Sequence, residues 1–214
     1  MSNFLPSRFE SGSAALIVID VQNDFCDPSG AIGQLGGNTS VVVDMIPRLQ
    51  QFIDDARRAG VLVVFVRTTH DTKTNSPQWL SRRGDLAAGA PRPVETCATG
   101  SWGAEFYRVH PEDSEPVVTK HRYSAFAGTD LDLVLRTAGV KSLLFTGVST
   151  NVCVESSLRD GSSHDYAVTL VDDCAASPDL QLHLNAIDNV ERYFGVVANS
   201  SEISQTWSLP NVPR

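Results

Sequence analysis

Short apolar runs alternate with helix-like segments along the whole chain, and this alternation constrains the fold more than any other feature. The apolar runs lie at residues 14–20, 61–66, 115–120, 143–145, 166–171 and 195–198. Between the first two, residues 40–59 repeat apolar side chains at helical spacing and end in Arg57-Arg58-Ala59-Gly60, a basic last turn with a glycine cap. Near-continuous apolar runs are typical of parallel strands buried on both faces. The pattern predicts an α/β protein, a three-layer αβα sandwich around a doubly wound, mostly parallel sheet of about six strands.

Length and charge narrow the class of protein. The 214 residues predict one domain spanning residues 1–214, without an internal repeat. A net charge of −8 argues against nucleic acid or an anionic membrane as partner, and no apolar run is long enough to cross a bilayer. The first residues lack the pattern of a secretory signal, and the four cysteines are scattered without metal-site spacing. We therefore expect a cytoplasmic protein that acts on a small molecule.

Residues 142–160, SLLFTGVSTNVCVESSLRD, hold the strongest candidate for a reactive group. An apolar strand ends at Thr146-Gly147, a polar turn follows, and apolar residues then recur at helical spacing. Cys153 is thereby placed in the first turn of a helix, just beyond the carboxyl end of a strand, where the helix dipole favours a thiolate. The alternative is that Cys153 is a small apolar residue packed between strand and helix.

Two charged residues share this topological position. Asp20 ends the first apolar run and Lys120 ends the third. Each has an ordinary interpretation, an acid turned outward to cap a helix and a solvated surface lysine. At one edge of a parallel sheet, however, an acid to accept the proton of Cys153 and an ammonium to stabilise its thiolate would form a working nucleophile. The backbone N–H groups of Ser149 and Cys153 would face a developing oxyanion.

At these residues the chain resembles the isochorismatase-like cysteine hydrolases. The resemblance runs from about Ala14 to Ile203 and is carried by LIVIDVQNDF at 16–25, the lysine of VVTKHRYSAFAGTDLDLVLR, and TGVSTNVCVESSLRDG around Cys153. It implies a Cys-Asp-Lys triad at Cys153, Asp20 and Lys120, a cis peptide before Ser149 and an oxyanion hole. Members that keep the cysteine hydrolyse C–N bonds of amides and ureido compounds through a thioester.

Within that family, the motifs are most similar to those of ureidoacrylate amidohydrolases, and biuret and N-carbamoylsarcosine amidohydrolases look similar over the same segments. Maleamate or a nicotinamide-like amide is a further alternative, and a catalytically idle homologue that binds a metabolite or partner is the rival from a different class. Nicotinamidases bind a metal through a histidine cluster after the second strand. Here that region holds only His70, so we expect no metal and no cofactor. The resemblance also implies a homodimer or homotetramer.

Residues around the motifs are candidates for binding substrate. The aromatic ones expected to wall the pocket are Phe25, Trp102, Tyr123 and Phe126, with core packing as the alternative for each. Arg82, Arg83 and Arg122 are candidates for pairing with a substrate carboxylate. The polar segment 71–103 is either a cover over the site or a surface excursion.

Overall fold

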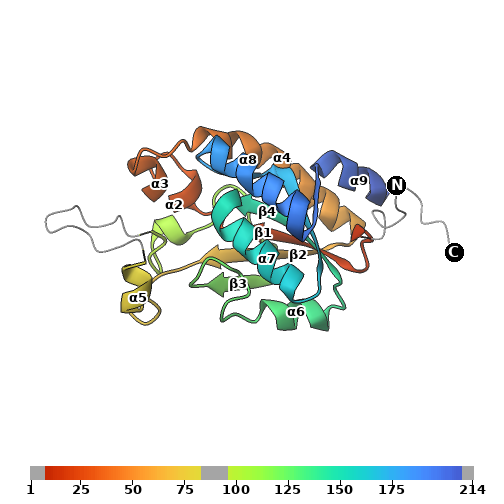
Figure 1. Ribbon diagram of the computed structural model, residues 1–214, viewed down its shortest axis with the longest axis horizontal. Helices are drawn as coiled ribbons and strands as arrows, with labels where there is room; N and C mark the ends of the chain where they lie inside the picture. Colours follow the sequence, from red (N-terminus) through yellow and green to blue (C-terminus); the bar gives the residue numbers. More distant parts are fainter. Residues whose placement is uncertain (1–7, 83–95, 209–214) are drawn as a thin grey trace, which may run out of the picture.

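The computed structural model describes residues 8–82 and 96–208, which fold around one six-stranded sheet (Figure 1). All strand pairs are parallel, in the order β3-β2-β1-β4-β5-β6. The strands are β1 (Ala14–Ile19), β2 (Leu62–Thr68), β3 (Val117–Lys120), β4 (Ser142–Val148), β5 (Ala167–Ala176) and β6 (Val196–Ala198). The predicted doubly wound α/β sandwich is confirmed. Because the chain turns outward in both directions from β1 and β4, these two strands form the switch point where a crevice site is expected.

Helices cover both faces of the sheet. The longer ones are α4 (Ser40–Ala59), α6 (Leu131–Thr137), α7 (Glu155–Ser163), α8 (Leu180–Asn189) and α9 (Ser200–Ser208). Short ones are α2 (Asn23–Cys26), α3 (Ala31–Gln34), α5 (Pro77–Leu80), η1 (Trp102–Ala104), η2 (Thr150–Val154) and η3 (Val190–Phe194). One core cluster packs α4 and α9 against the sheet, and a second packs α6, α7 and η3 against the other face. The predicted cap of α4 is also present, since Gly60 follows the helix in the left-handed conformation at φ 74°.

The fifth strand is longer than its sequence predicts. The apolar run ends at Val171, yet β5 continues to Ala176 because its pairing with β4 shifts register between Phe145 and Gly147. The irregularity turns the polar residues out of the sheet, and the carboxylate of Asp173 accepts hydrogen bonds from the N–H and hydroxyl of Ser200, both at 2.8 Å. Asp173, which the sequence places just after the end of the strand, therefore lies within β5 and caps the start of α9.

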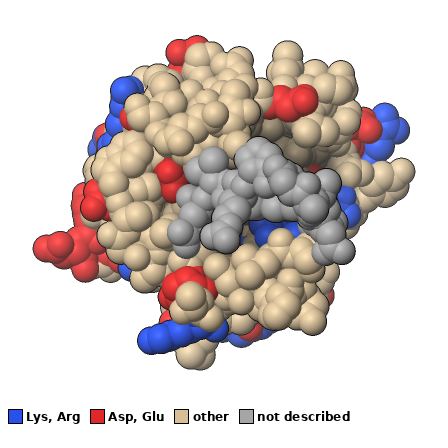
Figure 2. All heavy atoms as spheres, turned by 90° about the vertical axis from the view of Figure 1, so that its left-hand side faces the viewer, with Lys and Arg blue, Asp and Glu red and all other residues tan. Residues whose placement is uncertain are grey.

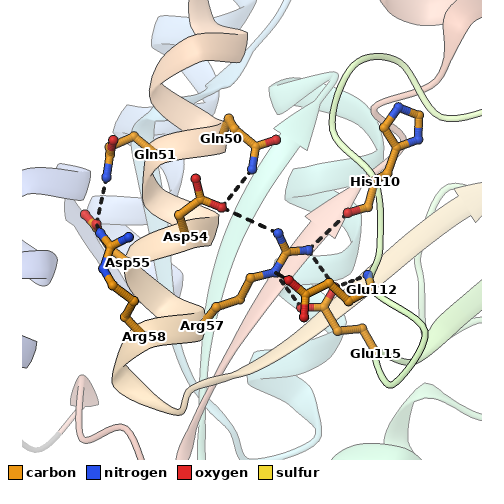
Figure 3. Close-up of polar contacts among 9 residues, drawn as sticks. All are labelled: Gln50, Gln51, Asp54, Asp55, Arg57, Arg58, His110, Glu112 and Glu115. Carbon is orange, nitrogen blue, oxygen red and sulfur yellow. Dashed lines mark hydrogen bonds and ion pairs between the residues drawn. The ribbon is translucent and has the colours of Figure 1, made fainter.

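An ion-pair cluster fastens the last turn of α4 to the segment before β3 (Figure 3). The guanidinium of Arg57 donates to both carboxylate oxygens of Glu115, each at 2.8 Å, and to the carbonyl of His110 at 3.0 Å. Such two-pronged pairing fixes orientation as well as distance. It holds the entry to β3, the strand that ends at Lys120.

Candidate active site

The carboxyl ends of β1, β3 and β4 bring Asp20, Lys120 and Cys153 into contact. Asp20 follows β1, Lys120 is the last residue of β3, and Cys153 lies in η2 just after β4. Nζ of Lys120 is 2.7 Å from Oδ2 of Asp20 and 3.4 Å from Sγ of Cys153. Its third contact is the carbonyl oxygen of Arg122, at 3.0 Å. One ammonium group therefore joins the acid to the thiol.

The sheet order explains why the cation is a long side chain. β2 lies between β3 and β1, so Lys120 starts two strands away from Asp20. Neighbouring strands are about 4.8 Å apart, which puts the two backbones about 10 Å from each other. A four-carbon stem spans most of that gap over the end of β2. The interpretation of Lys120 as a solvated surface lysine is wrong, because only 1% of its side chain is exposed.

Burial controls the charges of this group. Burial alone would lower the pKa of Lys120, but the neighbouring Asp20 and Cys153 outweigh it and hold its pKa above the ordinary value. Burial raises the pKa of the Asp20 carboxyl, and the Lys120 ammonium pulls it back only in part. The ammonium is the charge that we expect to persist at neutral pH.

The same environment overturns the expectation of a resting thiolate. Burial raises the pKa of the Cys153 thiol, Asp20 raises it further, and Lys120 offsets only part of the increase. The expected effect of the helix dipole is outweighed, because a buried thiolate beside a carboxylate is costly. Cys153 therefore holds its proton at rest and needs a base.

The Asp20 carboxylate is placed for that role. Its Oδ2 faces Lys120, its side chain also interacts with that of Cys153, and both of its oxygens are buried with no other hydrogen-bond partner among the residues that the structure describes. Buried carboxylate oxygens are seldom left unpaired. An acceptor of this kind beside a thiol that must lose its proton is suited to proton transfer.

The backbone at the switch point is shaped to bring β1 and β4 together. Asp20 has φ 53°, a left-handed conformation that is uncommon outside glycine, and its N–H donates to the carbonyl of Val66 at 2.9 Å. Gly147 approaches the carbonyl of Ile19 so closely that a Cβ atom there would lie 2.0 Å from the oxygen. Only glycine fits at this position, and its absence of a side chain lets Asp20 sit beside the start of η2.

The turn that carries Cys153, residues 149–154, combines several features. The Val148–Ser149 peptide is cis, as the family resemblance implied. The carbonyl of Ser149 accepts hydrogen bonds from the N–H groups of Val152 and Val154, at 3.0 and 3.3 Å. The carbonyl of Cys153 accepts one from the hydroxyl of Ser157 at 2.7 Å, which ties the turn to α7. The 149–154 turn is thus held at both ends.

The four aromatic residues predicted to wall the pocket do not all belong to one face of the sheet. Phe25 packs against the core on the α4 side of the sheet, whereas Cys153 belongs to the core on the α7 side. The ring of Phe126 stacks on His164 at a centroid distance of 5.0 Å, beyond the far end of α7. Both residues take part in core packing, and their role in the pocket stays a prediction.

Trp102 and Tyr123 remain candidates. Trp102 is 50% exposed on η1, and its carbonyl accepts a hydrogen bond from Asn23 at 2.7 Å. Tyr123 follows Lys120 by three residues and packs edge-on against Trp79, with centroids 5.0 Å apart. Its hydroxyl accepts a hydrogen bond from Nε of Arg82 at 3.0 Å.

Two arginines converge on the Trp79 ring. The guanidinium carbon of Arg82 lies 3.8 Å from the ring centroid and that of Arg122 lies 4.7 Å from it. Neither arginine makes an ion pair within residues 8–82 and 96–208. Arg83, the third candidate, and much of the 71–103 segment lie outside the described residues. Figure 2 looks onto this end of the molecule, where both basic and acidic side chains reach the surface.

Sequence reasoning missed the residues that brace the site. Gln22 is fully buried; its side-chain nitrogen donates to the carbonyls of Thr68 and Ala104, and its side-chain oxygen accepts from the N–H of Thr68. The carboxylate of Asp24 accepts from the N–H of Cys97 at 2.6 Å. Gln22 and Asp24 both belong to a polar run directly after a buried strand, and this position is the sequence feature from which their role could have been predicted.

Comparison with known proteins places this geometry in a family. The isochorismatase domain model matches residues 14–202. The chain belongs to the isochorismatase family. It is 34% identical to the ureidoacrylate amidohydrolase of Yersinia enterocolitica, over 91% of this chain and 89% of that protein. Among solved structures it is similar to a cysteine hydrolase from Pseudomonas syringae pv. phaseolicola, with 27% identity and a TM-score of 0.77 over 92% of this chain and 93% of the other.

A second solved structure is N-carbamoylsarcosine amidase from Thermoplasma acidophilum, with 27% identity and a TM-score of 0.71 over 88% of this family member and 96% of that chain. These relationships make the protein a hydrolase of C–N amide bonds. Within the described part of the chain, no cluster of three His, Cys, Asp or Glu side chains could hold a metal ion. In the same part, no helix is long and apolar enough to span a membrane.

Proposed function

We propose that this protein hydrolyses the C–N bond of a small linear ureido or carbamoyl compound, with a ureidoacrylate-like molecule as the leading candidate. In this proposal Cys153 is the nucleophile, Asp20 the proton carrier and Lys120 the electrostatic partner of both. The observation that carries the proposal is the buried ammonium of Lys120, in contact with the acid and the thiol at once. Burying a lysine, an acid and a thiol together costs free energy, and amide hydrolysis by a cysteine nucleophile gives these groups a chemical role.

The first half-reaction forms a thioester. The Asp20 carboxylate takes the proton of Cys153 as Sγ attacks the carbonyl carbon, and the electron pair of the C=O bond moves to oxygen. The N–H groups of Ser149 and Cys153 stabilise that oxyanion. When the C–N bond breaks, Asp20 gives its proton to the departing nitrogen, which leaves as ammonia or an amine.

The second half-reaction regenerates the enzyme. Asp20 takes a proton from water, the resulting hydroxide attacks the thioester carbon, and the C–S bond breaks. The sulfur recovers the proton from Asp20. Lys120 stays protonated throughout, because its pKa is held above the ordinary value, and it stabilises whichever neighbour is negative.

The two arginines that lie over Trp79 favour a substrate with a carboxylate. Arg82 and Arg122 lie over Trp79, and Lys120 donates to the carbonyl of Arg122. In this proposal the two guanidinium groups attract and orient the anionic end of the substrate. This feature supports ureidoacrylate or an N-carbamoyl amino acid over biuret or a nicotinamide-like amide, which are uncharged.

Ammonia release from a panel of ureidoacrylate, biuret, an N-carbamoyl amino acid, maleamate and nicotinamide tests the proposal. Wild type should release ammonia from ureidoacrylate or the N-carbamoyl amino acid, and Cys153→Ala should not. The Cys174→Ala variant is a matched control, since Cys174 is buried and its thiol interacts with Asp173, Ser200 and Arg48 rather than with Asp20 or Lys120. Full activity of Cys153→Ala, or a preference for the neutral amides, would contradict the proposal. A wild type that releases ammonia from none of the five compounds would favour the idle binding homologue.

We further propose a cytoplasmic homodimer or homotetramer. All four cysteines are free and buried, which suits a reducing compartment. Helix α8 exposes Leu180, Leu182 and Leu184 by 66%, 44% and 48%, an apolar surface suited to contact between copies. Light scattering coupled to gel filtration measures the state, and a monomer at micromolar concentration would contradict the assembly.

A further inference from the structure

The 149–154 turn is fastened to the corner between β5 and α8 by two side-chain hydrogen bonds. Oγ1 of Thr150 and Nδ1 of His183 are 2.8 Å apart. The hydroxyl of Ser177 donates to Oδ1 of Asn151, also at 2.8 Å. Neighbouring residues of one turn are thus held by residues far along the chain. The bonds of the turn to Ser149 and Ser157 link it to β4 and α7, whereas these two side-chain bonds link it to β5 and α8.

Thr150 stands at a sensitive point of this turn. It is fully buried, it follows Ser149, and it precedes Cys153 by three residues. In the proposed mechanism the oxyanion donors and the sulfur belong to these two flanking residues. A rotation of the turn about its own axis would therefore move donors and nucleophile together.

His183 is suited to hold Thr150 without taking part in the chemistry. It projects from α8, and it lines a cavity of about 280 Å³ with Asp172, Asp173, Asp44 and Arg48. It makes no described contact with Asp20, Lys120 or Cys153. Burial lowers its pKa, and the carboxylate of Asp172 offsets this in part, so that the neutral imidazole prevails near pH 7.

We infer that His183 is a positioning residue of this hydrolase: its Nδ1 holds the hydroxyl of Thr150 and thereby fixes the orientation of the 149–154 turn. The inference rests on the proposed function of Cys153 and extends it to a residue 30 positions further along the chain, on another helix. Misplacement of reacting groups by about 1 Å can cost about 100-fold in rate.

The test compares substitutions that keep or remove the Nδ1 contact. His183→Phe keeps the ring and removes the contact, and it should lower kcat by about 10- to 100-fold with KM changed less than about twofold. His183→Asn places an amide atom where Nδ1 was and should recover most of the loss, whereas His183→Gln extends past that point and should not. His164→Phe is the matched control, because His164 lies at the far end of α7. It should keep wild-type kcat.

A double-mutant cycle with Thr150→Val separates this role from general damage to the fold. If the two side chains act through one contact, the loss in Thr150→Val/His183→Phe should be close to that of either single variant. Thermal unfolding of each variant identifies any that fails to fold, and Thr150→Val then carries the test alone. Additive losses, an unchanged kcat in His183→Phe, or no recovery in His183→Asn would overturn the inference.

All rates are measured on whichever amide wild type hydrolyses fastest. A failure of the proposed function appears as continued turnover in Cys153→Ala, independently of His183. A failure of the present inference appears as wild-type kcat in the His183 variants while Cys153→Ala is inactive. The two outcomes are therefore distinguishable.

Discussion

The Asp20→Asn variant should make Cys153 more reactive toward an alkylating agent and yet nearly inactive as an enzyme. Asparagine keeps the shape of the side chain but removes its negative charge and its capacity to take a proton. Among the described residues, Lys120 would then be the only charge in contact with the sulfur. Because Asp20 raises the pKa of the Cys153 thiol and Lys120 lowers it, the pKa should fall in this variant.

The structure bounds the size of that fall. Nζ lies 2.7 Å from Oδ2 and 3.4 Å from Sγ, so those two atoms are at most about 6 Å apart, where unit charges interact by about 3 kcal/mol at an effective dielectric constant of about 20. This corresponds to about two pKa units. At fixed neutral pH the thiolate fraction then rises about 100-fold, and the lower nucleophilicity of a more acidic thiol reduces the gain to about 10-fold.

The assay is alkylation of Cys153 by iodoacetamide as a function of pH, followed by mass spectrometry of the peptide, with Cys153→Ala as the blank. The alkylation rate near neutral pH should rise by about 10-fold in Asp20→Asn. Turnover should fall by about 10²- to 10⁴-fold, the usual contribution of a general base. An unchanged alkylation rate would mean that Asp20 already carries a proton at rest, and retained turnover would mean that another group takes the proton of Cys153. Either result would refute the mechanism.

Three further perturbations test other parts of the structure. Lys120→Met should lower kcat/KM by at least about 100-fold, measured by ammonia release; a negligible loss would return Lys120 to a structural role. Arg82→Gln should raise KM for an anionic substrate about 10-fold and leave a neutral amide unaffected. Arg108→Gln is the control, because the guanidinium of Arg108 lies over the Tyr107 ring instead, and equal effects on both substrates would exclude a carboxylate contact. Arg57→Met should lower the free energy of unfolding by about 1.5–3 kcal/mol in urea titrations, because it leaves Glu115 unpaired; an unchanged midpoint would show that the cluster contributes nothing.

Local patterns were enough to predict the sheet and the residues at its edge. Continuous apolar runs marked the parallel strands, and the run at residues 14–20 predicted β1, which ends at Ile19, one residue before Asp20. The same logic failed for β5, because its register shift depends on pairing with β4 and on the Asp173 contact to Ser200. The apolar pattern of the sequence does not predict a strand that continues through two acidic residues.

Side-chain direction was the weaker part of the sequence prediction. Proximity to a motif predicted both Tyr123 and Phe126 as pocket residues. The hydroxyl of Tyr123 contacts Arg82, whereas the ring of Phe126 stacks on His164 at the far end of α7. Neighbours in sequence alternate between faces or rotate around a turn, so adjacency to a site residue does not place a side chain in the site.

The sequence by itself determined which chemical groups stand at the carboxyl edge of the sheet, because a buried strand ends where its apolar run gives way to polar residues. Only the tertiary structure decided how those groups behave. Lys120 reaches Asp20 and Cys153 across an intervening strand, and burial then reverses the expected thiolate into a protonated thiol. The link from His183 to Thr150 has the same origin. Hydrophobic periodicity depends on residues a few positions apart, whereas desolvation and charge interactions depend on what the folded chain places within a few ångströms.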